Sequence, residues 1–170
     1  MPGIPGPIIQ SGFVVEDLEA AVAHWASIGV GPFFAMRHVE FETCLYRGKP
    51  TDADLTVAIA YSGDHQIELV QQHNDAPSIY SDWLATRRPG LQHMGTLVDD
   101  LDAVLDANGW RGKRVQHGRT AAGQRFAYLD TVFHDGGMIE LIEADAAMLG
   151  AFAGMKAAAA KWDGSRALRG

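Results

Sequence analysis

The chain has 170 residues, of which 47% are hydrophobic and 21% are charged. This is ordinary globular composition and excludes wholesale disorder. A net charge of −7 without a basic run argues against nucleic-acid binding. No apolar run is long enough for a membrane span, the N-terminus lacks the features of a secretory signal, and the single cysteine, Cys44, cannot form an internal disulfide. We therefore expect a soluble, cytoplasmic protein without nucleic-acid or membrane partners.

The first half of the chain predicts the order β-α-β-β-β. Residues 8–15 are apolar and rich in β-branched side chains, as in a buried strand. Asp17 is a good helix N-cap, apolar residues then recur at helical spacing, and Gly29 is expected to end the helix. Further strands are expected at residues 33–39, 44–47, 55–61 and 66–71, which is one segment more than the repeated order contains.

The second half predicts the same order after a helix at residues 77–86. A strand is expected at 92–98, followed by a helix that Asp100 caps. Three more strands are expected near residues 114–116, 125–131 and 138–143. The alanine-rich tail predicts a further helix, and residues 163–170 are expected to fray.

The two halves also match in their letters. Gln10–Ala20 aligns without gaps on His93–Ala103, with Gly12 on Gly95 and Asp17 on Asp100. The closing strands, IELV at 67–70 and IELI at 139–142, match as well. The sequence therefore predicts an α+β protein of two β-α-β-β-β modules that form a curved mixed-sheet cleft. We place the modules at residues 8–73 and 90–144, and the C-terminal helix at 145–162.

Four repeat-equivalent positions carry polar side chains: Gln10, Glu68, His93 and Glu140. Each glutamate stands between apolar strand neighbours, where a buried carboxylate is costly unless it is paired or bound to a metal. Gly12 and Gly95 lie two residues after Gln10 and His93, on the same strand face, and are expected to leave space for an ion or substrate. Two carboxylates, an imidazole and an amide oxygen suit a divalent metal such as Zn, Ni, Co, Mn or Fe.

These modules and positions resemble the vicinal oxygen chelate superfamily, which includes glyoxalase I, methylmalonyl-CoA epimerase, extradiol dioxygenases and bleomycin-resistance proteins. The resemblance covers roughly residues 8–144. It implies a glyoxalase-like fold and a homodimer. It also implies one divalent metal ion, with zinc as the first choice, held by four ligands: Gln10, Glu68, His93 and Glu140. The order Gln, Glu, His, Glu is similar to the ligand set of zinc-dependent glyoxalase I.

The resemblance further implies a metal-dependent isomerase, epimerase or lyase of the glyoxalase type. Such an enzyme abstracts a proton next to a metal-bound carbonyl of a small or thioester substrate. Glu140 would be the catalytic base and Glu68 its partner on the opposite face, whereas Gln10 and His93 would only hold the metal. Two alternatives stay open: an extradiol-type dioxygenase, whose first ligand is usually histidine, and a metal-free protein that sequesters small molecules.

Other positions in the sequence bear on the substrate. Val14 stands where glyoxalase I usually carries an arginine for the carboxylate of glutathione, so the resemblance does not extend to glutathione. The segment Gly29–Phe34 and the apolar strand residues suggest a hydrophobic pocket for a thioester or for an aromatic or terpenoid ketone. Tyr128 is expected to be a packed aromatic residue rather than a substrate contact.

Overall fold

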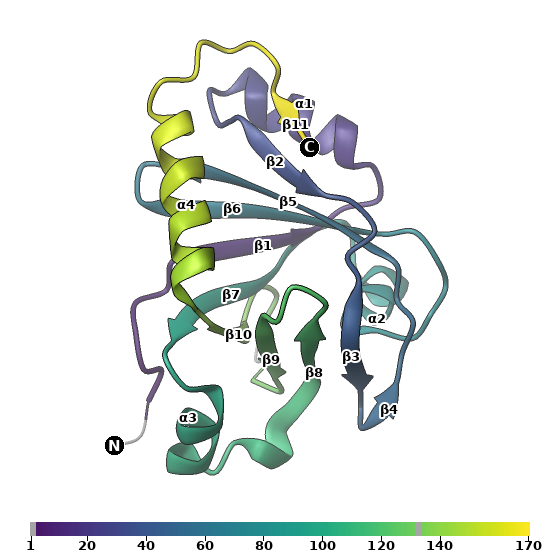
Figure 1. The fold of residues 1–170 in the computed structure, drawn as a ribbon. Helices are drawn as coiled ribbons and strands as arrows, with labels where there is room; N and C mark the ends of the chain where they lie inside the picture. Colours follow the sequence, from purple (N-terminus) through teal and green to yellow (C-terminus); the bar gives the residue numbers. More distant parts are fainter. Residues whose placement is uncertain (1–2, 132–133) are drawn as a thin grey trace.

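The structure is a computed structural model that describes residues 3–131 and 134–170. The described strands form one sheet of eleven, in the order β11-β2-β5-β6-β1-β7-β10-β9-β8-β3-β4 (Figure 1). Their bounds are β1 Gln10–Val14, β2 Phe33–Met36, β3 Phe41–Tyr46, β4 Lys49–Pro50, β5 Leu55–Ser62, β6 His65–Gln72, β7 Gly90–Val98, β8 Arg114–Thr120, β9 Arg125–Leu129, β10 Met138–Glu143 and β11 Leu168–Arg169. The helices are α1 Leu18–Ser27, α2 Ile79–Thr86, α3 Leu101–Asn108 and α4 Ala146–Ala159, with a 3₁₀ turn at Arg111–Lys113.

Each half of the chain contributes four strands in equivalent order. These are β2-β5-β6-β1 from the first half and β8-β9-β10-β7 from the second. Each opening strand pairs in parallel with its own closing strand, β1 with β6 and β7 with β10. The halves meet where β1 pairs antiparallel with β7. The α+β class and the mixed sheet predicted from the repeat are confirmed.

The helix caps also follow the repeat. The carboxylates of Asp17 and Asp100 accept hydrogen bonds from the backbone N–H groups of Ala20 and Ala103, each at 2.9 Å. An N-cap side chain satisfies one of the donors that a helix start leaves unpaired. Helix α3 ends at Gly109, whose φ of 65° is a left-handed conformation that favours glycine. Both predicted N-caps are therefore confirmed.

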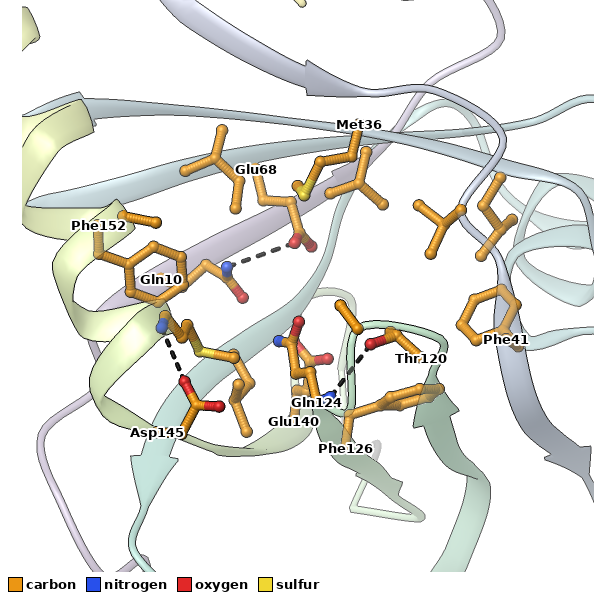
Figure 2. Close-up of a pocket in the computed structure, with 18 of the residues that line it drawn as sticks. Gln10, Met36, Phe41, Glu68, Thr120, Gln124, Phe126, Glu140, Asp145 and Phe152 are labelled. Atoms are coloured by element: carbon orange, nitrogen blue, oxygen red, sulfur yellow. Dashed lines mark hydrogen bonds between the residues drawn. The ribbon is translucent and has the colours of Figure 1, made fainter.

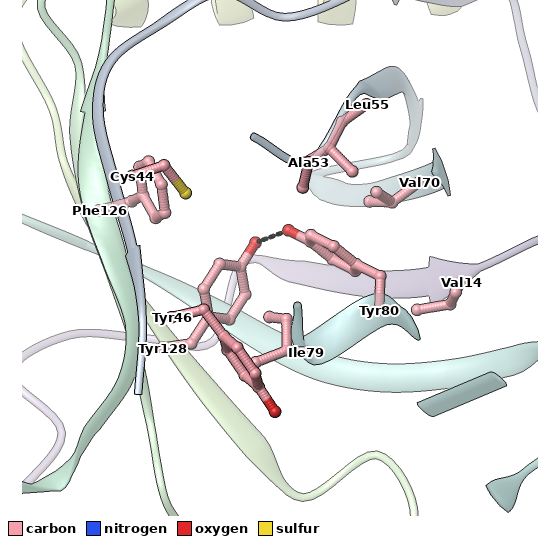
Figure 3. Close-up of a cluster of buried hydrophobic side chains, with 10 residues drawn as sticks. All are labelled: Val14, Cys44, Tyr46, Ala53, Leu55, Val70, Ile79, Tyr80, Phe126 and Tyr128. Carbon is pink, nitrogen blue, oxygen red and sulfur yellow. Dashed lines mark hydrogen bonds between the residues drawn. The ribbon is translucent and has the colours of Figure 1, made fainter. Parts of the chain in front are cut away.

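Strand β3 comes from the first half of the chain but pairs with a strand of the second half. It follows β2 in the chain, yet it pairs with β8 of the second half, and β4 extends the same edge. Apolar side chains from both halves fill the space between β3, α2 and the central strands (Figure 3). Cys44 packs in this cluster, and burial raises the pKa of its thiol to about 11. The division into modules at residues 8–73 and 90–144 stays a proposal.

The C-terminal segment is anchored at both ends, so the expectation that residues 163–170 fray was wrong. Strand β11 pairs in parallel with β2, and the backbone N–H of Phe33 donates to the carbonyl of Ala167 at 2.7 Å. The ring of Trp162 packs so closely on Gly31 that a Cβ there would lie 2.8 Å from it. A strand of two residues has no periodic pattern, so the sequence does not reveal this contact. Helix α4 thus connects β10 to the opposite edge of the sheet (Figure 1).

No helix in residues 3–131 and 134–170 is long and apolar enough to cross a membrane.

Candidate metal centre

The four polar residues singled out in the sequence come together at the centre of the sheet, and all belong to one chain. They lie on four adjacent strands: Glu68 on β6, Gln10 on β1, His93 on β7 and Glu140 on β10. Ligand atoms of Glu68, His93 and Glu140 all lie within 4.8 Å of one another. Gln10 joins them through a hydrogen bond of 3.4 Å from its Nε2 to Oε1 of Glu68. None of the four residues is more than 7% exposed.

The glycines beside these residues act across the two halves of the chain. Because β1 and β7 are antiparallel, Gly12 lies opposite His93 and Gly95 lies opposite Gln10. A Cβ at Gly12 would lie 1.9 Å from Nε2 of His93, and one at Gly95 would lie 2.5 Å from Oε1 of Gln10. The expectation that each glycine leaves space for an ion or substrate was therefore wrong in detail. Each glycine makes room for the polar side chain of the other half.

Two buried glutamines fix the orientation of the groups from the opening strands. His93 donates from Nδ1 to Oε1 of Gln92 at 3.1 Å, and Gln92 donates from Nε2 to the carbonyl of Ile79 at 2.8 Å. Gln10 donates from Nε2 to Oε1 of Gln66 at 3.0 Å, and Gln66 in turn donates to the hydroxyl of Tyr61. Both chains of hydrogen bonds leave the metal-binding atoms free, namely Nε2 of the imidazole and Oε1 of the amide.

The donor set fits a divalent cation. Oε1 of Gln10 and Oε2 of Glu140 are buried and have no hydrogen-bond partner among the described residues. Buried oxygen atoms without partners are costly, and a cation would satisfy both. His93 Nε2 lies 3.0 Å from Oε2 of Glu68 and 3.6 Å from Oε2 of Glu140. One imidazole nitrogen, two carboxylates and one amide oxygen suit zinc and its first-row neighbours.

The pKa values of Glu140 and His93 are both raised, for different reasons. The pKa of Glu140 is raised to about 8, first by burial and then by the like charge of Glu68, against the opposing effects of His93 and Tyr128. Burial lowers the pKa of His93, but the hydrogen bond with Glu68 and the charges of Glu140 and Glu68 outweigh it, so this pKa is raised. Without a bound cation, the site therefore binds protons, which offset its negative charge in place of the metal.

Two tyrosines lie near Glu140. Tyr80 donates a hydrogen bond to the hydroxyl of Tyr128 at 2.9 Å (Figure 3), and Tyr128 lies directly opposite Glu140 on the neighbouring strand β9. The edge of the Tyr128 ring also meets the ring of His93, with centroids 5.1 Å apart. Both tyrosines line the cavity described next. Tyr128 is therefore a packed aromatic residue, as expected, but it also faces the cavity.

A cavity of about 320 Å³ opens beside the four residues (Figure 2). Gln10, Glu68 and Glu140 form its polar end, whereas His93 lies behind them. Strands β5, β8 and β9 from both ends of the sheet line the cavity, so the sheet curls around it. Helix α4 closes one side with Met148, Phe152 and Met155. The residues of Gly29–Phe34 are not among its lining, so the expectation for that segment was wrong, because Phe33 packs in the core under α1.

Sequence reasoning missed the residues that support the site. Gln66 and Gln92 stand within two positions of Glu68 and His93, and this spacing is their only signal in the sequence. Tyr80 lies on α2, outside both repeats, and carries no such signal. The alanine-rich composition of α4 does not reveal that this helix lines the cavity.

Comparison with known proteins agrees with this geometry. The family model of the Glyoxalase/Bleomycin resistance protein/Dioxygenase superfamily matches residues 9–128. A methylmalonyl-CoA epimerase from Mycobacterium tuberculosis is 22% identical with a TM-score of 0.56, over 86% of this chain and 93% of that one. A hypothetical protein from Bacillus halodurans C-125 is 15% identical with a TM-score of 0.59, over 84% and 96%. No curated protein matches. The family match covers Gln10, Glu68 and His93 and ends before Glu140, and the chain belongs to the Glyoxalase/Bleomycin resistance protein/Dioxygenase superfamily.

Proposed function

We propose that this protein is a metal-dependent isomerase, epimerase or lyase of the glyoxalase type. The proposal rests on one observation: two carboxylates and an imidazole converge within 4.8 Å at the floor of an apolar cavity. Gln10, Glu68, His93 and Glu140 would hold one divalent ion, with zinc as the first choice. Such an ion acts as a Lewis acid that stabilises negative charge on a substrate carbonyl oxygen.

Glu140 is the residue that we assign to proton transfer. Glu140 lines the cavity, so a carbon acid bound there can reach its carboxylate. Glu140 accepts the proton from the carbon next to the carbonyl, beside Tyr128, which lies opposite it on β9. Glu68 faces the same cavity from β6, and strands β1 and β7 lie between β6 and β10. It can return a proton to the opposite face of the substrate.

The two alternatives fit the donor set less well. The iron of many oxygenases takes two histidines and one carboxylate, whereas this centre has one histidine and two carboxylates. A metal-free binding protein has no need to bury two carboxylates around one imidazole, because that arrangement costs free energy without a compensating cation. The convergence of all four residues therefore favours the metal-dependent enzyme.

The first experiment measures the metal content of the purified protein and of Glu140→Ala. We expect about one zinc, nickel, cobalt or manganese ion per chain in the wild type and a clear loss in the variant. Glu16→Ala removes an exposed carboxylate that is not part of the cavity lining, so it is the matched control and should retain the metal. Iron together with oxygen consumption on a catechol would instead support the dioxygenase. No metal in the wild type, even after reconstitution, would leave the binding protein as the leading alternative.

A homodimer also remains a proposal. All four residues come from a single chain, so the site does not require a partner to be complete. Sedimentation of the metal-loaded protein at several concentrations tests the dimer, and a single monomeric species at all of them would contradict it.

A further inference from the structure

The charges around the cavity restrict what can enter it. Three carboxylates line it, those of Glu68, Glu140 and Asp145, and its described lining includes no lysine, arginine or histidine. Nearby cations are engaged outside it, since Arg37 pairs with Glu19 at 3.4 Å and Lys156 pairs with Asp64. A divalent ion would offset Glu68 and Glu140 and leave no positive charge for an anionic substrate group. An anion in this enclosed space would therefore be poorly compensated.

The walls of the cavity are apolar. Met155 on α4 and the strand residues Ile59 and Ile142 line it. Phe152 and Phe126 line it as well (Figure 2). A cavity of about 320 Å³ with mainly apolar walls and a few convergent polar groups suits a small organic ligand. The body of the ligand lies against these walls, and its reactive oxygen faces the polar end.

One further donor in the cavity lacks a partner. Oε1 of Gln116 accepts a hydrogen bond from the backbone N–H of Ile79 at 3.0 Å, which fixes the orientation of the amide. Its Nε2 is buried and has no hydrogen-bond partner among the described residues, and Gln116 lines the cavity. A buried donor without a partner is costly, so a ligand oxygen at this place would be stabilised. Gln116 pairs with Tyr128 and Tyr128 with Glu140, so this donor lies two strands from the candidate base, about 10 Å along the sheet.

We propose that the substrate is an uncharged, largely apolar carbonyl compound with a second acceptor oxygen that Gln116 binds. This inference rests on the proposed function, because the reactive carbonyl is placed at the candidate metal centre. The described lining has no cation to pair with a substrate carboxylate, which argues against an anionic substrate. The apolar walls favour an apolar body, and Gln116 favours an acceptor oxygen remote from the reacting carbon. Gln116 is therefore a specificity-determining residue.

The test uses three probes that share one aromatic ring: α-hydroxyacetophenone, its para-methoxy derivative and the anion phenylglyoxylate. Their dissociation constants are measured by calorimetry on metal-loaded protein, with the metal content of each sample determined in parallel. We expect both neutral probes to bind about tenfold more tightly than phenylglyoxylate, because the cavity supplies no counter-charge. We expect the methoxy derivative to bind about fivefold more tightly than its parent, the effect of one net hydrogen bond.

Two variants separate the contributions. Gln116→Met should abolish the difference in affinity between the two neutral probes. The ratio of their two dissociation constants is insensitive to a general loss of affinity. If that variant does not fold, Gln116→Glu keeps the acceptor for Ile79 and serves in its place. Gln124→Lys places a cation in the lining and should strengthen binding of phenylglyoxylate relative to α-hydroxyacetophenone.

The outcomes distinguish this inference from the proposed function. A metal-loaded wild type that binds phenylglyoxylate as tightly as the neutral probes would overturn the substrate class and leave the metal-dependent enzyme standing. A wild type that retains no metal but still prefers the neutral probes would support the ligand class and contradict the enzyme. A methoxy preference that survives in Gln116→Met would show that Gln116 does not select the second oxygen.

Discussion

Gln92 has no contact with the cavity, yet it decides which nitrogen of His93 is available. Its amide oxygen accepts the Nδ1–H of the imidazole, so Nε2 points toward the two carboxylates. Groups that orient a metal ligand in this way commonly matter almost as much as the ligand, because a wrong tautomer presents a proton where a lone pair is needed.

Replacement of Gln92 by methionine should weaken metal binding about 10–100-fold, which is the usual effect of losing an orienting partner. Competition with a chromophoric chelator measures this change. Gln92→Glu is the matched control, because it keeps an oxygen that accepts from Nδ1 and should bind the metal more tightly than the methionine variant. Equal affinities in both variants and the wild type would show that Gln92 does not orient His93.

At this scale, the sequence predicted the residues that the repeat duplicates. Glu68 and Glu140 were visible because a glutamate recurs in two matching apolar strands, and Gln10 and His93 because they open matching segments. Gln66 and Gln92 were not predicted, since their roles depend on partners more than ten positions away, Gln10 and Ile79. Their importance follows from tertiary hydrogen bonds rather than from a local pattern.

Helix α4 is the element that turns an open sheet into an enclosed site. Its residues Met148, Phe152 and Met155 line the cavity, although none of its side chains is fully buried. The helix depends on its two ends. Asp145 caps its start with a hydrogen bond of 2.8 Å to the N–H of Met148, and the pairing of β11 with β2 holds the chain beyond it.

Deletion of residues 161–170 should loosen α4, because it removes Trp162 and β11 together. We expect the melting temperature to fall by several degrees, about the effect of losing 1–2 kcal/mol in a protein of this size. Binding of α-hydroxyacetophenone should weaken more than tenfold, whereas metal content should stay unchanged because the four ligands lie on other strands. Lys161→Ala changes an exposed residue of the same segment but keeps Trp162 and β11, so it is the control. Metal loss in the deletion would contradict this separation.

The positions of the helices and strands were largely predictable from the sequence, whereas the pairing of the strands was less so. Asp17 and Asp100 predicted the starts of two helices, and the strands predicted at residues 55–61 and 66–71 are β5 and β6. The sequence did not reveal that β3 leaves its own half to pair with β8. Strand pairing over such distances depends on the arrangement of whole halves, which periodicity does not encode.

The protein as a whole is expected to respond to pH in opposite ways with and without metal. Without metal, the folded pKa of Glu140, about 8, exceeds the ordinary value of 4.5, and the pKa of His93 is raised as well. Protons therefore favour the folded state. This contribution is fully present below the pKa values of the unfolded chain and is lost as the pH rises through the folded values.

We therefore expect the melting temperature of the metal-free protein to fall between about pH 6 and pH 9. A saturating divalent metal should stabilise the protein most at the upper end of this range, because the metal replaces the protons. Differential scanning calorimetry across this range checks both. Glu140→Gln removes one titrating carboxylate and should flatten the metal-free curve. A metal-free curve that rises with pH would show that the buried carboxylates are not protonated in the folded state.

The positions of Gly12 and Gly95 beside ligands of the opposite half also have an evolutionary consequence. Gly12 accommodates His93 and Gly95 accommodates Gln10, so each half of the duplication holds a space that the other half needs. A lineage that replaced His93 with a small residue would remove the steric reason for glycine at position 12, and mutation there would then go unopposed. A later return of the imidazole would meet a side chain in its place. Loss of this centre would thus tend to be irreversible, and the ligand of one half and the glycine of the other should be inherited together.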